Sequence, residues 1–226
     1  MAEKTKLWYL ENFNLFKGLC NDEMEKLMKS TVMKEAKKGQ YIYFPEEPSS
    51  SVFLLKEGKI KIGSFSEEGK ETIKAILNPG EIFGELSLAG EEKRSDFAQA
   101  LTDNVVICAM SKDDMEMLME KNAKIGIRVT KIMGLRLKRT ERKINDLIFK
   151  DVRTRIIDFL KDWAKEEGVP VGDEIMIKHN LTHQDIANLT ATTRQSVTTI
   201  LNELKDKNLI YTERKKILIR DIQRLR

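Results

Sequence analysis

The sequence predicts an α+β protein with three parts: an N-terminal antiparallel β-roll of the jelly-roll type, a long helix, and a C-terminal winged helix-turn-helix. In support, residues 32–110 alternate short apolar runs with Gly, Pro and acidic turns. Residues 123–149 contain no proline and carry apolar side chains at helical spacing. Residues 181–209 have the pattern of two short helices joined by a tight turn. We therefore place the domains at residues 1–122, 123–149 and 150–226.

The N-terminal part begins with a helix and continues as strands. Residues 7–30 are expected to form an amphipathic helix, with apolar positions at Leu15, Leu19, Leu27 and Met28. Strands are predicted at the runs YIYF, SVFLL, KIKIGSF, ETIKAIL and VVICAM. The sequence from Ser66 to Lys70 suits a hairpin connection between the strands at 59–65 and 72–77.

Two helices follow, at Lys112–Glu120 and from about Ala123 to Phe149. The long helix carries a seam with alternating steps of three and four, which is typical of a two-stranded coiled coil. The seam consists of Thr130, Met133, Leu137, Thr140, Ile144 and Leu147. A second stripe at Ile125, Val129 and Ile132 is expected to pack on the β domain. We therefore favour a parallel homodimer through the seam, with packing of the seam inside one chain as the alternative.

The C-terminal part is predicted to start after a hinge at residues 149–152. Asp151 caps a helix with apolar positions at Ile156, Phe159, Leu160 and Trp163. A hairpin is expected over residues 168–178, before the helix-turn-helix. After it, residues 210–221 form two strands around a basic tip, as in a winged helix. Lys215 at that tip is expected either to contact a phosphate backbone or to be a plain solvated turn.

The second helix of the helix-turn-helix has the polar outer face of a DNA-reading element. Thr182 opens the first helix in a capping box, and Thr192 or Thr193 caps the second. The outer face consists of Arg194, Gln195, Thr198, Thr199 and Asn202, opposite an apolar face of Val197, Ile200, Leu201 and Leu204. Arg and Gln can make paired hydrogen bonds to guanine and adenine edges, while the hydroxyls of Thr193 and Ser196 suit phosphates. Two alternatives stay open: Gln195 as the capping-box partner of Thr192, and Arg194 as a phosphate ligand.

The segment Phe83–Ala98 (FGELSLAGEEKRSDFA) has the features of a phosphate cradle. Gly84 lets the backbone bend or approach a ligand, and a helical turn after Glu85 would point N–H groups at an anion. Arg94 adds a charged donor fork, Ser95 adds a hydroxyl, and Glu85 suits a ribose hydroxyl. The alternative is a surface loop in which Glu85 and Arg94 pair with each other.

Composition narrows the classes of protein. Hydrophobic content of 41% and charged content of 34% describe a folded soluble chain. The sequence contains neither a run of about 18 apolar residues nor a secretory signal pattern, so we expect no membrane segment. Two cysteines, Cys20 and Cys108, are too few for a disulfide framework or a four-thiolate cluster, which favours reduced thiols in a cytoplasm. His179 and His183 are expected to be surface or capping residues, leaving no metal site and no His-supported nucleophile.

Charge is unevenly distributed along the chain. Basic and acidic residues number 18 and 22 in residues 1–124, 7 and 2 in residues 125–149, and 15 and 12 in residues 150–226. The net positive charge therefore lies C-terminal to residue 124, where it would attract a phosphate backbone without reading its sequence. A solvated basic helix would give the same count.

Three segments together resemble the bacterial family of the cyclic AMP receptor protein and the fumarate-nitrate regulators, the CRP/FNR family. GEIFGELSL followed by Lys93-Arg94-Ser95 is similar to the phosphate-binding cassette of that family. MGLRLKRTERKINDLIFKDVRTRI is similar to the end of its long helix, and LTHQDIANLTATTRQSVTTILNELKDKNLI to its DNA-binding signature. The resemblance runs from about Phe13 to Arg220.

The resemblance implies a cytoplasmic, homodimeric, sequence-specific transcription regulator and not an enzyme. Its partners would be a roughly palindromic DNA duplex, a second copy and RNA polymerase. It would need no obligatory cofactor, and cyclic AMP or a related cyclic nucleotide would be its effector.

The resemblance also implies roles for single residues in the cassette. Glu85 would hold the ribose 2′-hydroxyl, Arg94 and Ser95 the cyclic phosphate, and Gly84 and Leu86 would make backbone contacts. Thr140 matches the position whose hydroxyl meets the adenine. Glu141 replaces the serine that reaches over from the partner chain in cyclic-AMP-responsive members.

On the recognition helix, Arg194 and Gln195 match two base-reading positions by the same resemblance. Thr199 replaces a third, an arginine, so we expect a different operator sequence. The oxygen-sensing branch of the family needs four cysteines, and this chain has two. The carbon-monoxide-sensing branch needs a histidine in the β domain, whereas both histidines here lie in the DNA-binding domain. Both branches therefore fit less well.

The alternative function is the same DNA-binding regulator without a cyclic nucleotide, either constitutive or responding to another metabolite or a redox signal through Cys108 or Cys20. A regulatory subunit that binds cyclic nucleotides would not need the helix-turn-helix.

Overall fold

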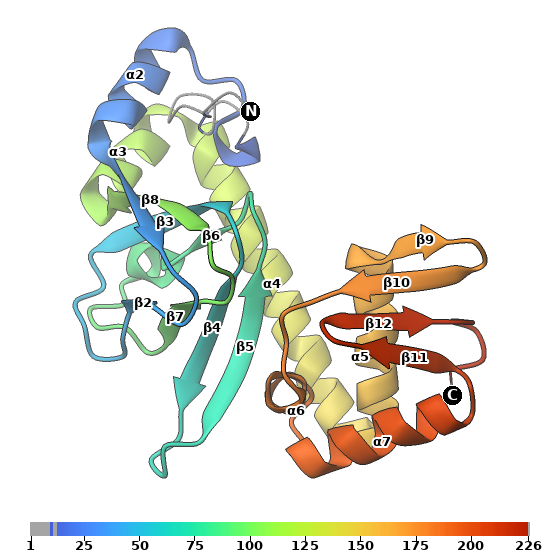
Figure 1. Cartoon of the computed structure of the whole chain (residues 1–226). Coiled ribbons are helices and arrows are strands. Elements are labelled where there is room, and N and C mark those ends of the chain that lie inside the picture. The colour runs from blue at the N-terminus through green and yellow to red at the C-terminus, as the bar shows by residue number, and fades with distance from the viewer. Residues whose placement is uncertain (1–9, 11–12, 226) are drawn as a thin grey trace. The chain divides into compact units, whose positions relative to one another are not determined.

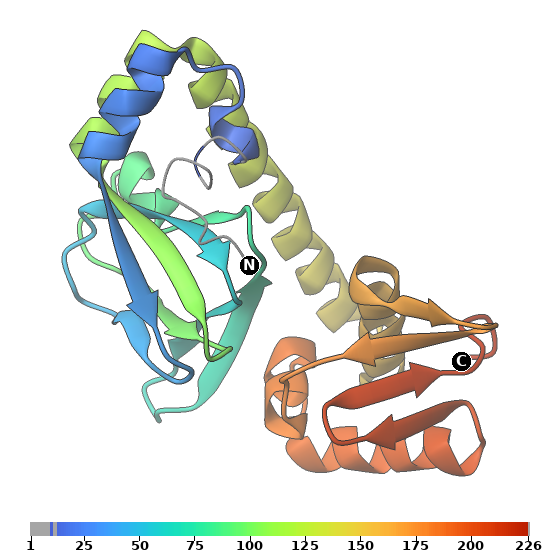
Figure 2. The ribbon, with the colours of Figure 1, turned by 45° about the horizontal axis from the view of Figure 1, so that its top comes forward.

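The computed structural model describes Leu10 and residues 13–225, and the chain divides into two compact units. Apart from Glu71–Ile73, the first unit ends at Leu137 and the second begins at Lys138. The division therefore falls inside the long helix α4 (Ala123–Phe149), which was predicted with these bounds. Figures 1 and 2 show the elements of each unit.

The first unit contains two four-stranded sheets whose resolved strand pairings are antiparallel. One sheet has the order β1 (Thr31–Ala36), β8 (Val105–Ser111), β3 (Ser51–Glu57) and β6 (Ile82–Phe83). The other has the order β2 (Tyr41–Tyr43), β7 (Phe97–Ala100), β4 (Ile60–Phe65) and β5 (Glu71–Leu77). The hairpin turn between β4 and β5 closes where predicted, with the Ser66 N–H donating to the Lys70 carbonyl at 2.9 Å. These sheets confirm the predicted β architecture.

Two apolar clusters hold the first unit together. One lies between the sheets and includes the stacked rings of Phe53 and Phe83, whose centroids are 5.0 Å apart. The other joins β3 and β8 to the helices α2 (Asn21–Ser30), α3 (Lys112–Lys121) and α4. Ile125 and Val129 are buried in this second cluster and Ile132 packs against it, which confirms the predicted stripe.

The N-terminal helix is shorter than predicted. A 3₁₀ turn, η1 (Asn14–Phe16), precedes α2, and Gly18 between them has φ +89°, a left-handed conformation that ends any helix there. The carboxylate of Glu23 then accepts the Cys20 N–H at 2.9 Å and starts α2. Residues 7–9 and 11–12 of the predicted helix lie outside the described residues. The predicted apolar positions do face the core, with Leu15 and Leu27 buried and Leu19 and Met28 partly buried.

The seam predicted on α4 is mostly exposed in the single chain. Leu137 is 61% exposed, Ile144 51% and Leu147 50%, and Thr130 and Thr140 are also exposed. Met133 differs, because it packs against the core cluster of the first unit. The described part of the chain contains no helix long and apolar enough to span a bilayer.

In the second unit, two helices contact a four-stranded sheet and a third helix packs on those two. The helices are α5 (Val152–Glu167), α6 (His183–Thr190) and α7 (Arg194–Asp206). The sheet has the order β11 (Ile210–Glu213), β12 (Lys216–Ile219), β10 (Glu174–Lys178) and β9 (Val169–Val171). Figure 2 shows α7 running along the β11 side of this sheet, with which it is in contact. The hairpin, the helix-turn-helix and the wing were all predicted.

The α5 helix supplies the center of the second core. Asp151 caps it as predicted, by accepting the Thr154 N–H at 2.7 Å. Ile156, Leu160 and Trp163 are buried as expected, and Ile157 joins them. Phe159 is only partly buried and packs its ring on Trp163, with centroids 5.2 Å apart.

Candidate DNA interface and effector cassette

The first turn of α7 is set by Thr193. Its hydroxyl accepts the Ser196 N–H at 3.1 Å, and the two hydroxyl oxygens are 2.9 Å apart. The cap is therefore Thr193, so that Ser196 and not Gln195 stands at the third helical position. The alternative in which Gln195 serves a Thr192 capping box is wrong, and the Gln195 side chain is exposed.

The two faces of α7 follow the predicted pattern, with one correction. Its inner face of Val197, Ile200, Leu201 and Leu204 is buried, and Arg194, Gln195, Thr199 and Asn202 are exposed. Thr198, predicted on the outer face, is half-buried. Its hydroxyl donates to the Arg194 carbonyl at 2.9 Å and lies 2.9 Å from Nδ1 of His183, because the close α6–α7 crossing brings that ring to it.

The turn between α6 and α7 is held by an arginine that sequence reasoning missed. Arg155 on α5 donates to the carbonyls of Thr190 and Ala191, each at 3.0 Å, and to that of Lys150 at 2.8 Å. Ala191 takes a left-handed conformation with φ +49°. A guanidinium bound to three carbonyls fixes the angle at which α7 leaves the turn. No local pattern marks Arg155, since its partners are selected by the packing of α5.

The remaining predicted DNA contacts lie at the edges of this unit. Thr182 is exposed and closes the expected capping box: its N–H donates to Asp185 at 2.8 Å, and its hydroxyl accepts the Asp185 N–H at 3.1 Å. Lys215 is exposed at the tip of the β11–β12 hairpin with φ +63°. Its carbonyl accepts the His179 N–H at 2.9 Å, which ties the wing to the segment before α6.

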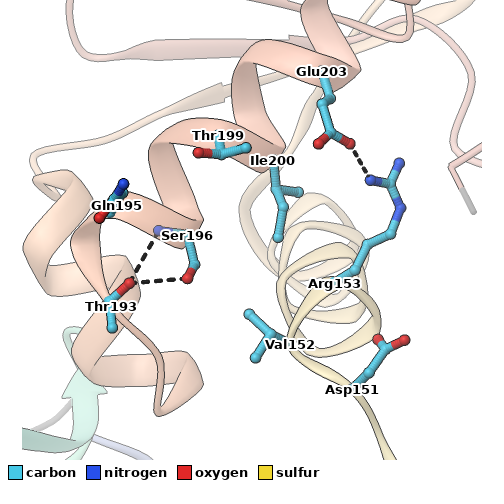
Figure 3. A pocket seen from close by; sticks show the side chains of 9 residues that line it. All are labelled: Asp151, Val152, Arg153, Thr193, Gln195, Ser196, Thr199, Ile200 and Glu203. Carbon is cyan, nitrogen blue, oxygen red and sulfur yellow. Dashed lines mark hydrogen bonds and ion pairs between the residues drawn. The ribbon is translucent and has the colours of Figure 1, made fainter.

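Four of the predicted DNA residues line one depression of about 600 Å³ between the start of α5 and α7. These are Thr193, Gln195, Ser196 and Thr199, and Figure 3 shows them along α7. Arg153 and Glu203 form an ion pair at the other end of the depression. Neither was found from the sequence, because they are 50 residues apart and lack a motif.

The cassette of the first unit is built around Gly84. This residue has φ +73° and precedes the 3₁₀ helix η2 (Glu85–Ala89), the helical turn predicted there. A Cβ at this position would lie 2.8 Å from Nη1 of Arg94 and 2.9 Å from the Ser51 carbonyl oxygen. Only glycine fits, both for its backbone angle and for its space. Leu86 is 43% exposed, and its carbonyl accepts the Glu91 N–H at 3.0 Å.

Arg94 is turned inward and is only 2% exposed. It donates to the carbonyls of Gly84, at 3.0 Å, and Ser51. Its guanidinium carbon lies 4.5 Å from the Tyr43 ring centroid and 5.7 Å from that of Phe53. Its Nε is buried and has no hydrogen-bond partner among the described residues. A buried donor without an acceptor is costly, so a hydrogen bond from this Nε to a ligand would be favourable.

Glu85 pairs with a helix residue and not with Arg94. Its carboxylate, 9% exposed, forms an ion pair with Arg136 of α4, which also donates to the Ile82 carbonyl. The predicted alternative of a Glu85–Arg94 pair is therefore wrong. Arg136 was missed, although its place on α4 four residues before Thr140 was a signal that could have found it.

Ser95 is already bound to a carboxylate. Its N–H and hydroxyl donate to Oε1 of Glu91 at 3.0 and 2.7 Å, and the Ser49 hydroxyl donates to Oε2 at 2.9 Å. The structure thus brings together Gly84, Glu85, Leu86, Arg94 and Ser95. Thr140 and Glu141 are exposed residues of α4 and belong to the second unit.

Comparison with known proteins assigns both units. Residues 33–122 match the cyclic nucleotide-binding domain, and residues 154–226 match the Crp-like helix-turn-helix domain. The chain is 33% identical over 220 residues to the "cAMP-activated global transcriptional regulator CRP" of Salmonella typhimurium, covering 96% of this chain and 95% of the relative. This chain belongs to the CRP/FNR family. It is a CRP-like DNA-binding transcription regulator with an effector domain, and it is not an enzyme.

Relatives within the CRP/FNR family carry different names. A "CRP-like cAMP-activated global transcriptional regulator" of Mycobacterium tuberculosis is 28% identical over 216 residues, 96% of each chain. A "Global nitrogen regulator" of Nostoc sp. is 30% identical over 189 residues, 83% of this chain and 85% of the relative. The solved structure of a CooA mutant from Carboxydothermus hydrogenoformans superposes with a TM-score of 0.78 at 26% identity, over 99% of this chain and 95% of that one.

The DNA-binding unit of this family member is expected to lose stability in mild acid. Burial lowers the pKa of His179, as does the nearby charge of His183, against the opposing effect of the Leu181 carbonyl. The unfolded chain, with a histidine pKa of about 6.5, then binds more protons than the folded one. The free energy of unfolding is therefore unaffected by His179 above a pH of about 6.5 and declines as the pH falls below that value.

Urea unfolding followed by circular dichroism at pH 7.5 and 5.5 measures this effect. We expect the urea midpoint to fall in acid, and to fall less for His179→Gln than for the unmodified protein. Equal losses in both proteins would show that His179 does not contribute.

Proposed function

We propose that this family member is a homodimer that binds a roughly palindromic DNA site and is switched by a cyclic nucleotide, with cyclic AMP favoured, bound at the cassette. The observation that carries the effector part is Arg94, a buried guanidinium beside a glycine turn, whose Nε has no hydrogen-bond partner in the described part of the chain. Matches to relatives named as cAMP-activated regulators support the choice of nucleotide. We also propose a bacterial cytoplasmic location and RNA polymerase as a partner, by analogy with those relatives.

At the DNA, α7 would enter the major groove. Arg194 and Gln195 would read base edges, and Thr199 occupies the third reading position. The hydroxyls of Thr193, Ser196 and Thr182 and the ammonium of Lys215 would contact phosphates. These side chains all lie on one unit and are exposed there, except Ser196, which is half-buried; this supports the assignment.

At the effector, Arg94 and Ser95 would hold the cyclic phosphate, Glu85 the ribose 2′-hydroxyl, and the backbone of Gly84 and Leu86 would complete the cradle. On α4, Thr140 and Glu141 would meet the adenine. A carboxylate can accept a hydrogen bond from the exocyclic amine, so Glu141 is compatible with adenine.

Pairing of two chains through the α4 seam would couple these sites. The dimer would place two α7 helices at half-sites about 34 Å apart, one turn of the duplex. An effector acts only by binding the DNA-competent arrangement better than the other. About 2–3 kcal/mol of differential affinity would change DNA binding by about a hundredfold.

Calorimetric titration with cyclic AMP and cyclic GMP tests the effector part. We expect cyclic AMP to bind and Arg94→Leu to weaken it at least thirtyfold, or about 2 kcal/mol, because a charged bidentate donor is lost. Lys93→Leu is the matched control, since the Lys93 side chain is 67% exposed and forms a surface ion pair with Glu46. Thermal unfolding of each variant checks that the β-roll stays folded.

Absence of binding by both nucleotides, or binding that survives Arg94→Leu, would overturn the cyclic-nucleotide part. The second candidate is then the same DNA-binding regulator without a cyclic nucleotide, constitutive or responsive to another metabolite or redox state. Two observations favour this second candidate: Glu141 stands where cyclic-AMP-responsive members carry a serine, and the chain is similar to a global nitrogen regulator. Strong DNA binding by the effector-free protein would support this second candidate.

A further inference from the structure

The donors of the cassette converge on a carboxylate of the same chain. Glu91 accepts the Ser95 N–H at 3.0 Å, the Ser95 hydroxyl at 2.7 Å and the Ser49 hydroxyl at 2.9 Å. Nη1 of Arg94 lies 4.0 Å from Oε2 of Glu91. An amide N–H, two hydroxyls and a guanidinium around one anion are the donors expected of a phosphate site.

The environment of Glu91 keeps it ionised. Its side chain is 15% exposed. Burial acts to raise its pKa, but the hydrogen bonds from Ser95 and Ser49 and the charge of Arg94 outweigh burial and hold the pKa below its ordinary value. At neutral pH this residue is therefore a negative charge that is already bound by the cassette donors.

We propose that Glu91 is an internal anion that occupies the phosphate position of the cassette in the effector-free protein, so that a phosphate-bearing effector must displace it. This inference rests on the proposed binding of a cyclic nucleotide at the cassette. Two anions cannot share Ser95 and Arg94, because like charges a few ångströms apart repel each other and compete for the same donors. Glu91 thereby sets the affinity for the effector and limits it to ligands that can replace a carboxylate.

Displacement has a route in this segment. Gly90, which precedes Glu91, has φ +93° and ends η2, and a Cβ there would meet nothing within 4 Å. A flexible link beside the carboxylate lets it leave the donors without moving the strands. The apparent affinity for the effector is the intrinsic affinity multiplied by the fraction of molecules in which the site is open. Removal of the Glu91 charge should increase that fraction and thereby raise the affinity.

The test compares calorimetric affinities for cyclic AMP in the full-length protein and in two single variants. Glu91→Gln keeps the shape and one acceptor oxygen but removes the charge. Glu92→Gln removes the same charge from the next residue, whose side chain is exposed, and is the matched control. We expect Glu91→Gln to bind at least tenfold more tightly than the unmodified protein and Glu92→Gln to stay within twofold of it.

A second variant covers the case in which Glu91→Gln does not fold. Ser49→Ala removes one hydroxyl that holds Glu91 and lies outside the segment Phe83–Ala98. We expect it to release the carboxylate partially and to raise the affinity about threefold. Equal affinity of Ser49→Ala and the unmodified protein would then count against the proposal.

The outcomes separate this inference from the proposed function. Nucleotide binding by the unmodified protein with no gain in Glu91→Gln, or with an equal gain in Glu92→Gln, overturns the inference alone. Binding that is at least tenfold tighter in Glu91→Gln, with Glu92→Gln within twofold of the unmodified protein, supports it. No binding by any variant overturns the inference together with the cyclic-nucleotide part of the proposed function.

Discussion

Replacement of Ser196 by glutamate is expected to lower the affinity for DNA at least a hundredfold, which corresponds to about 2.7 kcal/mol. Ser196 lies at the third position of α7, within the depression lined by Thr193 and Thr199. In the proposed complex this edge of α7 faces phosphates, so a carboxylate there would repel the backbone and lose a hydroxyl donor. The helix itself tolerates the change, because glutamate three residues after a threonine cap completes a capping box and suits a helix N-terminus.

Fluorescence anisotropy with a palindromic duplex, selected by the unmodified protein from a random pool, measures this loss. Ser196→Ala removes only the hydroxyl and should cost about two- to fivefold. Gln223→Glu adds the same charge at an exposed position near the C-terminus and should leave the affinity within twofold. If Ser196→Glu still binds like the unmodified protein, α7 is not the element that meets DNA.

Replacement of Leu137 or Ile144 by glutamate is expected to convert the dimer into single chains at micromolar concentration and to reduce DNA binding with it. Both side chains are more than half exposed in the single chain, at 61% and 51%, and both lie on the seam of α4. In a paired seam each carboxylate would be buried without a partner, which costs several kcal/mol per chain.

Sedimentation velocity distinguishes this loss of pairing from a general effect of charge. Leu135→Glu is the matched control, because Leu135 is 62% exposed and lies two positions before Leu137, off the seam. We expect Leu135→Glu to remain a dimer. If all three variants stay dimeric, the seam is not the interface; if the unmodified protein is monomeric, the homodimer proposal fails.

Arrangements that depend on neighbours in the chain were predictable from the sequence. Gly and acidic turns marked the strands, and the steps of three and four gave α4 its two faces. Asp151 and Thr182 were recognisable as cap residues, and Thr193 as one of two candidates with Thr192, because a cap is satisfied within three residues. The family resemblance pointed to the same cassette and recognition helix.

The partners of the charged side chains were not predictable in this way. Arg94 donates to the carbonyls of Gly84 and Ser51, the latter 43 residues earlier, and neither partner was expected. Glu85 was considered a partner for Arg94 and is paired with Arg136, 51 residues away. Arg155 had no visible role, although it fixes the turn before α7.

The sequence by itself therefore determined the elements, their caps and faces, and the family. Only the tertiary structure decided which cation meets which acceptor. It also decided that the Ser95 hydroxyl is bound by Glu91 and does not face an open site. The physical reason is that helix and strand periodicity acts over a few residues, whereas a buried charge takes its partner from whichever segments the folded chain brings within about 3 Å.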